Sequence, residues 1–343
     1  MVKYKVISLS NAIKLVKVLP PAVKLWWGIE LAPGVYIIMA KPKMGKSIFG
    51  ESFVIALLNK YQTEFLGMPI TTLNLVVILS FEEMMILRTL RNIKQLEALD
   101  SKLKEEILDK FFVFDDESAQ FVPDNNGRIA LLRMLMELQP QVIIIDSLGR
   151  LGVGQIEDSR YSQELMLFVR EIAKELNCPV IVLHHTVKTK KGDNVELATM
   201  AGSRLIGQEA DGVLTIIEGK EPGVKIIKPV AWRYHGDYET EIHFKITENC
   251  LVEHVRTVTN DGNTVVLKSD SNFDKLKAFI DAKGEVFIHE LLKEFVDTNV
   301  MSRSTLFTLL GKKPIVKVGP GKYSLIFNED GPTEIGGPSI LNI

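Results

Sequence analysis

The fold is constrained most by five short apolar segments that lie between residues 34 and 185. Each is rich in Val and Ile without alternating polar residues, which is typical of strands buried on both faces. The segments are GVYIIMA (34–40), LNLVVILS (73–80), FFVF (111–114), QVIIID (141–146) and PVIVLHH (179–185). Helix-like segments lie between them, over residues 47–62, 83–99, 127–139 and 160–177. This alternation predicts an α/β fold with a mostly parallel, doubly wound sheet.

The pattern changes after about residue 212. Strand-like segments then follow one another without helices between them, which predicts that the sheet ends in an antiparallel meander. These segments are residues 212–219, 223–233, 240–247, 250–258 and 263–269. We therefore expect a lead segment over residues 1–28 and one large domain over residues 29–268.

Residues 272–328 read as a second, small domain, because three helix-like segments are followed by a hairpin, the order of a winged helix. The third helix, residues 302–313, would enter the major groove of duplex DNA. The same fold often serves only as a protein contact, so both roles stay open. The predicted DNA contacts are Arg303, Ser304, Thr305, Lys312, Lys313, Lys317 and Lys322. Residues 329–343 are expected to form a flexible tail.

Composition limits the setting of the protein. The formal net charge of −2 gives no overall attraction to nucleic acid, so DNA binding would need local basic patches. Cys178 and Cys250 have no metal-ligand spacing around them, and a reducing cytoplasm is the expected compartment. The sequence has no signal peptide pattern and no run of 18 apolar residues, so we expect no membrane span.

Residues 40–47, AKPKMGKS, fall one glycine short of the phosphate-loop pattern G-x-x-x-x-G-K-[ST]. Ala40 replaces the first glycine, which is acceptable if the backbone there does not need a positive φ. The loop N–H groups would bind the phosphates of ATP, Lys46 would reach the terminal phosphates and Ser47 would bind Mg²⁺. The predicted nucleotide-binding residues are Lys41, Pro42, Lys43, Met44, Gly45, Lys46, Ser47 and Ile48.

Two acidic positions are predicted to complete this site. Asp146 ends an apolar segment and would hold Mg²⁺ together with Ser47. Ser147 follows it where many nucleotide hydrolases carry Glu, so the group that orients the attacking water must come from elsewhere. We expect that group to be Glu82, which follows the second strand-like segment, with Glu83 as the alternative.

A pair of histidines ends the fifth apolar segment, VIVLHHTVK. Adjacent side chains of a strand face opposite ways, so at most one of the two points at a nucleotide. We expect His185 to contact the terminal phosphate and His184 to be packed or bonded locally, although two purely structural histidines stay possible.

The phosphate loop, the distant Glu, the Asp-Ser pair and the strand that ends in His-His-Thr occur in this order, and together they resemble the RecA-type ATPase core. More narrowly they resemble the RepA-like replicative helicases of plasmids and mobile elements, which are related to the DnaB family. The resemblance runs from residue 20 to about residue 245. It implies that Lys46 and Ser47 bind phosphate and magnesium, that Glu82 is the catalytic carboxylate, that Asp146 is the Walker B residue and that His185 is the phosphate sensor.

Proteins of this group work as rings, so the resemblance implies a homo-oligomer, most simply a hexamer, with an arginine supplied by the neighbouring subunit. Arg233 in VAWRYHG occupies the place where DnaB-like proteins carry a Lys-x-Arg pair. Ala231 stands at the Lys position, which leaves open whether one cation or two reaches the neighbouring nucleotide. A surface role for Arg233 stays possible, and Arg204 is the next candidate.

Single-stranded DNA would lie in the centre of the ring, and Lys188, Lys190 and Lys191 are predicted to contact it, although they fit a solvated loop equally well. The leading interpretation is a cytoplasmic, ATP- and Mg²⁺-dependent ATPase that moves along or unwinds DNA. The alternatives are a RadA-like recombinase paralogue and a DNA-binding regulator that nucleotide only switches.

Overall fold

The structure is a computed structural model, and its contacts divide the chain into two units, Met1–Val266 and Leu267–Ile343. In the part of the chain that the structure describes, no helix is long and apolar enough to cross a membrane. Cys178 and Cys250 are free thiols. The described residues are 8–17, 23–97, 99–114, 124–152, 156, 158–186, 204–234, 236–259, 276, 279–280, 283–296, 306, 310, 315–319 and 322–325.

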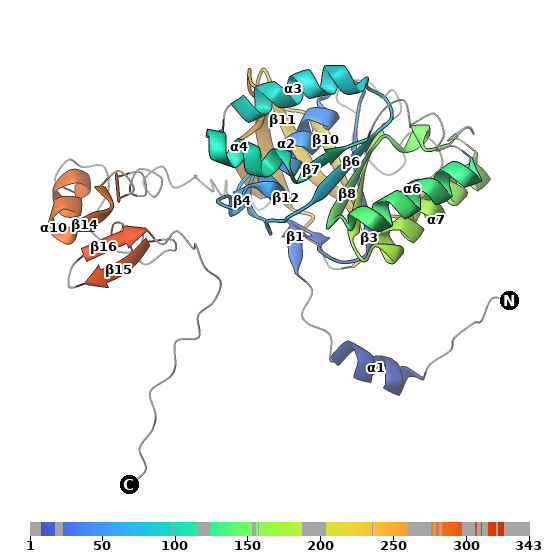
Figure 1. The fold of residues 1–343 in the computed structure, drawn as a ribbon, viewed down its shortest axis with the longest axis horizontal. Helices are drawn as coiled ribbons and strands as arrows, with labels where there is room; N and C mark the ends of the chain where they lie inside the picture. The colour runs from blue at the N-terminus through green and yellow to red at the C-terminus, as the bar shows by residue number, and fades with distance from the viewer. Residues whose placement is uncertain are drawn as a thin grey trace, which may run out of the picture. The chain divides into compact units, whose positions relative to one another are not determined.

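The first unit is built on a sheet of nine described strands in the order β13-β12-β11-β10-β3-β9-β8-β6-β7 (Figure 1). The strands from β10 to β7 pair in parallel, whereas β11, β12 and β13 form an antiparallel meander. The strands are β3 (Gly34–Ala40), β6 (Val76–Ser80), β7 (Phe111–Val113), β8 (Val142–Asp146), β9 (Pro179–His185), β10 (Gly212–Glu218), β11 (Val224–Trp232), β12 (Thr240–Ile246) and β13 (Val252–Thr259). The predicted fold class is confirmed, and the predicted strand over residues 263–269 lies outside the described residues.

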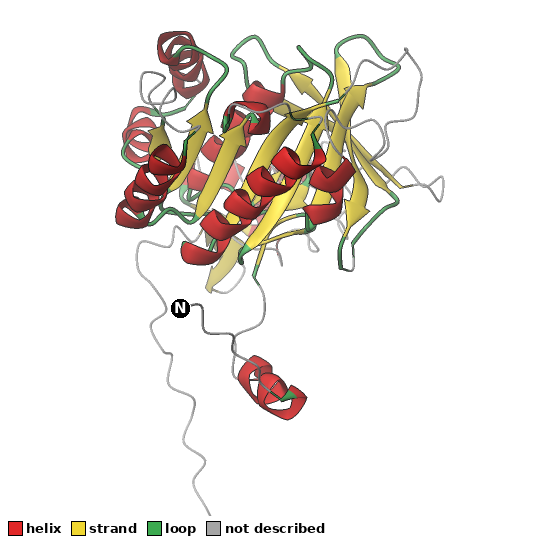
Figure 2. Ribbon diagram, turned by 90° about the vertical axis from the view of Figure 1, so that its right-hand side faces the viewer, coloured by secondary structure: helices red, strands yellow, loops and turns green. Residues whose placement is uncertain are grey.

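Helices cover both faces of this sheet, as Figure 2 shows. Alternate residues of β3 enter two separate cores, so that Ile38 packs on one face and Ile37 on the other. The first core includes residues of α2 (Lys46–Leu58), α3 (Met85–Glu97) and α4 (Ser101–Leu108). The second includes residues of α6 (Asn125–Leu138), α7 (Ser159–Glu175) and α8 (Arg204–Glu209).

The expectation that all five apolar segments are buried on both faces was wrong for β7. Phe112 and Val113 are each 37% exposed. The reason is position, because β7 is the edge strand and pairs only with β6 among the described strands.

Several short elements were not predicted. The strands β1 (Lys24–Trp26) and β2 (Ile29–Glu30) pair with each other, as do β4 (Glu64–Phe65) and β5 (Met68–Pro69). Trp26 is fully buried, its ring centroid lies 5.1 Å from that of Phe53, and its Nε1 donates to the carbonyl of Phe65 (2.9 Å). The predicted boundary between residues 28 and 29 therefore separates two paired strands of one core. The lead segment also contains a helix, α1 (Leu9–Lys17), and α4 and α8 were likewise not predicted.

The second unit contains an antiparallel sheet in the order β14-β16-β15. Its strands are β14 (Glu285–Phe287), β15 (Ile315–Gly319) and β16 (Lys322–Leu325), and its helical segments include α10 (Ile288–Leu291) and the π-helical η3 (Leu292–Val296). The predicted hairpin is present as β15 and β16, and β14, which was not predicted, pairs with β16. The winged helix stays a prediction.

Candidate functional site

The predicted site forms where four neighbouring parallel strands end. Ala40 of β3 is in register with His185 of β9, and Asp146 of β8 is in register with Ser80 of β6. Parallel strands present their carboxyl ends at one edge of the sheet, and ligands of such folds bind in the crevice outside that edge. The sheet therefore brings the phosphate loop, Asp146, His185 and the segment after Ser80 together.

The phosphate loop connects β3 to α2, which begins at Lys46. Ala40 is extended as the last residue of β3, and its carbonyl accepts a hydrogen bond from the N–H of Thr186 (3.1 Å). The left-handed backbone lies further along, at Lys43 (φ 64°) and Gly45 (φ 84°). This explains why alanine can replace the first glycine of the pattern. The side chain of Met44 is buried in the core, so its side chain is not available to a ligand.

Gly45 has a backbone φ that L side chains rarely adopt, and a side chain there would also have to displace a neighbour. A Cβ atom at this position would collide with Cδ1 of Ile246, the last residue of β12. The antiparallel meander thus packs against the phosphate loop at this point.

Lys46 is nearly buried and is connected to Glu82 through His185. Its Nζ lies 3.0 Å from Nδ1 of His185, and Nε2 of His185 lies 3.1 Å from Oε2 of Glu82. An ammonium group only donates, so Nδ1 accepts and Nε2 carries the proton that is donated to Glu82. Burial lowers the pKa of Lys46, and the carboxylates of Asp146 and Glu82 oppose that shift. His184 is 3% exposed, so His185 is the member of the pair that faces the loop.

Glu82 is held as a carboxylate. The hydrogen bond from His185 and, after the opposing effect of burial, the hydrogen bond from Ser147 lower the pKa of Glu82 to about 2. Glu83 points away from this group and accepts hydrogen bonds from Arg91. The two carboxylates therefore point to different partners, with Glu82 on the side of the phosphate loop, and the catalytic role of Glu82 stays a prediction.

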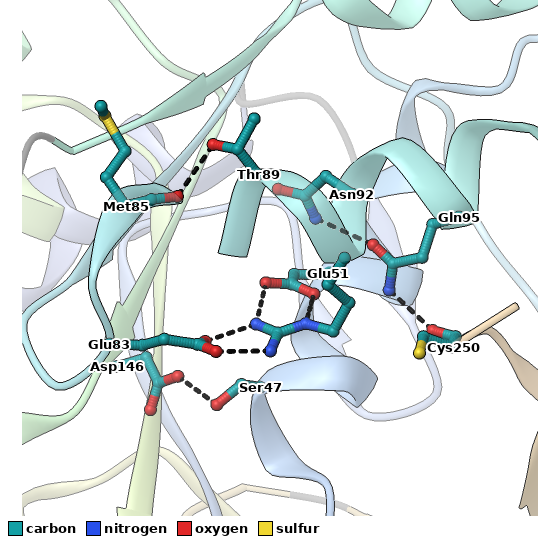
Figure 3. Close-up of polar contacts among 10 residues, drawn as sticks. Ser47, Glu51, Glu83, Met85, Thr89, Asn92, Gln95, Asp146 and Cys250 are labelled. Carbon is teal, nitrogen blue, oxygen red and sulfur yellow. Dashed lines mark hydrogen bonds and ion pairs between the residues drawn. The ribbon is translucent and has the colours of Figure 1, made fainter. Parts of the chain in front are cut away.

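Ser47 and Asp146 are hydrogen-bonded to each other, and Ser47 Oγ donates to Oδ2 of Asp146 (2.6 Å) (Figure 3). Burial raises the pKa of Asp146, and the hydrogen bond from Ser47 opposes that shift. A hydroxyl and a carboxylate are hard oxygen ligands of the kind that Mg²⁺ takes, together with water and substrate phosphate. Among the described residues no group of three or more His, Cys, Asp and Glu forms a metal site of its own. The pair therefore fits a magnesium ion that arrives with a nucleotide.

Arg233 lies beside the amino ends of the parallel strands, whereas the phosphate loop lies at their carboxyl ends. It follows β11, whose Trp232 is in register with Gly212 at the start of β10, and Gly212 is in register with Tyr36 near the start of β3. Its Nε lies 3.3 Å from Oδ1 of Asp211 and its Nη2 donates to the carbonyl of Gln208 (2.9 Å). Arg233 is thus not brought to the phosphate loop of its own chain, and its action on a neighbouring subunit stays a prediction.

The other predicted contacts are mostly not described by the structure. Eight of them lie outside the described residues, namely Lys188, Lys190, Lys191, Arg303, Ser304, Thr305, Lys312 and Lys313. Arg204 begins α8, and the burial of its side chain is outside the described part. Lys317 is exposed on β15, and Lys322 forms an ion pair with Glu285.

Sequence reasoning missed an ionic cluster behind the loop. Arg91 of α3 binds Glu51 of α2 and Glu83 at once. One signal for it exists, because Glu51 lies in the apolar stretch SIFGESFVIALL and a buried charge needs a partner. Nothing in the sequence identifies Arg91 as that partner.

Comparisons with known proteins identify the family and the fold. A family model named AAA_25 and described as an AAA domain matches residues 7–191. The fold is similar to a solved structure described as an ATPase domain, at 16% identity over 69% of this chain and 85% of that chain, with a TM-score of 0.50. It is also similar to a DnaB-like replicative helicase, at 15% identity over 72% of this chain and 67% of that chain, with a TM-score of 0.54. A comparison with curated protein sequences found no match. These similarities confirm the predicted RecA-like fold.

We expect Gly45→Ala to weaken the binding of a fluorescent ATP analogue with Mg²⁺ by at least about tenfold, which corresponds to about 1.4 kcal/mol. The alanine must adopt a left-handed backbone and displace Ile246. The matched control is Gly223→Ala, because Gly223 also has a positive φ (75°) but a Cβ there would meet no described atom within 4 Å. Both variants should lose about 1–2 kcal/mol of unfolding free energy from the backbone alone. Equal nucleotide affinity in the two variants would contradict the expected role of the loop.

Proposed function

Because the chain belongs to the AAA_25 family of AAA domains, we propose that it is an ATP-dependent ring ATPase that moves along DNA, and more narrowly a replicative helicase of a mobile element. The observation that carries the proposal is the hydrogen-bonded chain from Lys46 through His185 to Glu82, beside the Ser47–Asp146 pair. The carboxyl ends of the parallel strands thereby carry a cation, a candidate phosphate sensor, a carboxylate and a pair of candidate magnesium ligands.

Binding of ATP is assigned to the loop between β3 and α2. The N–H groups around Gly45 and the N-terminus of α2 would hold the phosphates, because these N–H groups lack partners within the helix. Lys46 would transfer its hydrogen bond from His185 to the terminal phosphates. Its burial strengthens that interaction, since charges attract more strongly where water is excluded.

Ser47 and Asp146 would hold Mg²⁺, which neutralises charge on the phosphate oxygens. The side chains need little rearrangement for this, because their oxygen atoms already lie 2.6 Å apart. Ser47 would direct its oxygen to the ion, and Asp146 would hold it directly or through water.

Hydrolysis is assigned to Glu82. The hydrogen bonds from His185 and Ser147, which lower the pKa of Glu82, favour its ionised form, and a carboxylate can accept a hydrogen bond from water and orient that water toward the γ-phosphate. His185 contacts both Lys46 and Glu82, so departure of the γ-phosphate would change the hydrogen bonds of His185 directly. The chain that follows His185 carries the lysines predicted to contact single-stranded DNA.

The ring, most simply a hexamer, and the DNA contacts are proposed from the family resemblance. The single strand would pass near Lys188, Lys190 and Lys191, and the second unit would contact duplex DNA or a protein partner. Arg233 would act on the nucleotide of the neighbouring subunit, because it lies at the edge of the sheet opposite to its own phosphate loop.

A forked DNA duplex tests the proposed activity. We expect the wild-type protein with ATP and Mg²⁺ to displace one strand at a rate that follows ATP hydrolysis. Lys46→Ala should abolish both, since it removes the principal cation of the phosphate site. Hydrolysis on DNA without strand displacement would favour a recombinase-like protein, and DNA binding that nucleotide alters without steady hydrolysis would favour a switched regulator.

We expect Glu82→Gln to bind the ATP analogue with an affinity within a few-fold of wild type, because the phosphate and magnesium ligands stay in place. Turnover should fall by about a hundredfold, the magnitude typical of a lost general base. The matched control is Glu137→Gln on the exposed surface of α6, which should hydrolyse ATP normally. Turnover of Glu82→Gln close to wild type would instead assign the role to another residue.

Mixed assemblies test Arg233. We expect Arg233→Ala to bind ATP but not hydrolyse it, because the arginine acts mainly on charge that develops in the transition state. Mixing it with inactive Lys46→Ala should restore part of the activity, since some boundaries then join an intact loop to an intact arginine. Arg133→Ala, an exposed arginine of α6, is the control. Normal hydrolysis by Arg233→Ala at every protein concentration would rule out the assignment and make Arg204 the next candidate.

A further inference from the structure

Helix α3 exposes apolar side chains and buries polar ones, which is the reverse of an ordinary surface helix. Ile86, Leu87 and Leu90 on its outer side are more than half exposed, at 63%, 54% and 57%. The buried side chains of this helix are Arg88, Asn92, Gln95 and Leu96. Surface helices are normally held by an apolar stripe that faces the core. Helix α3 is held instead mainly by its polar side.

Arg91 provides the largest part of this polar attachment. Its Nε and Nη2 donate to Oε2 and Oε1 of Glu51, each at 2.6 Å. Its Nη1 and Nη2 donate to Oε1 and Oε2 of Glu83 at 2.7 and 2.5 Å. A guanidinium group can bind two carboxylates in this way because its donors form a rigid planar fork. Further along α3, Gln95 donates to the carbonyl of Cys250 (2.7 Å).

The two carboxylates belong to the two parts of the site that must be aligned. Glu51 lies on α2, the helix that begins at Lys46. Glu83 directly follows Glu82 in the chain, and no helix or strand is assigned to either residue. Arg91 therefore connects the helix of the phosphate loop to the segment that presents Glu82. This connection runs behind the site, and Arg91 itself makes no contact with Lys46, Asp146 or His185 in any hydrogen bond of the described residues.

The charges show how much depends on this one side chain. Glu51 is 2% exposed, and its burial raises its pKa although Arg91 opposes the shift. Without Arg91, the carboxylates of Glu51 and Glu83 would both lose the guanidinium group that binds them. Arg88, one turn earlier on α3, is the nearest replacement on the helix. It is 2% exposed, and its three guanidinium nitrogens have no hydrogen-bond partner among the described residues.

We propose that Arg91 is a positioning residue, which holds Glu82 at a fixed place relative to the phosphate loop by binding Glu83 and Glu51 together. The inference rests on the proposed function, because it assigns to Arg91 a part in ATP hydrolysis. It predicts an effect on turnover that is separate from nucleotide affinity, since the groups that bind phosphate stay untouched.

The first experiment compares Arg91→Ala with Lys94→Ala, which removes the same charge from the exposed side of α3. We expect Arg91→Ala to lower kcat by about thirtyfold, which is less than the roughly 10²- to 10⁴-fold that loss of a general base costs, because the base is misplaced rather than removed. The affinity for the ATP analogue should change by less than about threefold, and Lys94→Ala should keep both values. Arg91→Lys should recover only part of kcat, because an ammonium group keeps the charge but cannot bind both carboxylates as a fork. A kcat of Arg91→Ala close to that of wild type would overturn the proposal.

A double-variant cycle with Glu82→Gln separates positioning from a general loss of stability. If Arg91 acts through Glu82, Arg91→Ala should cost little further turnover once Glu82 has been replaced by Gln. If the two losses multiply, Arg91 acts by another route and the proposal is wrong. Should Arg91→Ala fail to fold, Glu83→Gln removes one half of the bridge and leaves the Arg91–Glu51 pair. Glu83→Gln should then lower turnover in the wild-type background but cost little further turnover once Glu82 has been replaced by Gln.

Amide hydrogen exchange gives a measurement that does not need catalysis. Exchange in residues 81–90 should become faster in Arg91→Ala and stay unchanged in Lys94→Ala, because only the first variant releases Glu83 from α2. Unchanged exchange in Arg91→Ala would overturn the proposal even where turnover falls. Wild-type protein that hydrolyses no ATP would overturn the proposed function, whereas an active wild type with an equally active Arg91→Ala would overturn only the role of Arg91.

Discussion

The parallel pairing of β3 with β9 and of β8 with β6 determines where every chemical group of the site lies. The phosphate loop can be recognised in the sequence, but a loop alone aligns nothing. Because Ala40 and His185 are in register, the residues that follow β3 and the end of β9 emerge side by side, and Lys46 can reach Nδ1 of His185. Asp146 emerges one strand further along, within 2.6 Å of Ser47 Oγ. The aliphatic cores on both faces of the sheet hold this register, so the apolar residues indirectly fix the polar ones.

Opposite charges lie close together in the site. Lys46 is nearly buried, and its ammonium group lies near the carboxylates of Asp146 and Glu82, which offset the cost of its burial. Glu82 in turn is stabilised as a carboxylate by His185. A triphosphate would take the place of His185 as the hydrogen-bond partner of Lys46, while Asp146 and Glu82 stay in their places. Such preorganised groups stabilise charge without having to rearrange at the moment of reaction.

The sequence predicted the parts of the fold that local pattern determines and failed where strand order or distant pairing decides. The central strands were predicted because continuous aliphatic runs fit a sheet covered on both faces. The partial exposure of β7 was not, because its place at the edge depends on the order of all other strands. The sequence could predict that Glu82 and His185 belong to one site, because the carboxyl ends of parallel strands lie side by side. The bridge between Glu51 and Arg91 could not, because it joins residues 40 positions apart through side chains alone.

The phosphate loop lies at the carboxyl ends of the parallel strands, and Arg233 lies at their amino ends. A residue at one edge cannot complete a site at the other edge of the same molecule, so a catalytic contact between them requires a second copy. The surface around the phosphate loop would then face the surface around Arg233, and these are different surfaces. Contacts between different surfaces are head-to-tail, and they continue from copy to copy until they close as a ring or extend as a filament. A dimer with two-fold symmetry could make this contact only if both surfaces belonged to one self-complementary patch, in which the loop of each copy meets the arginine of the other.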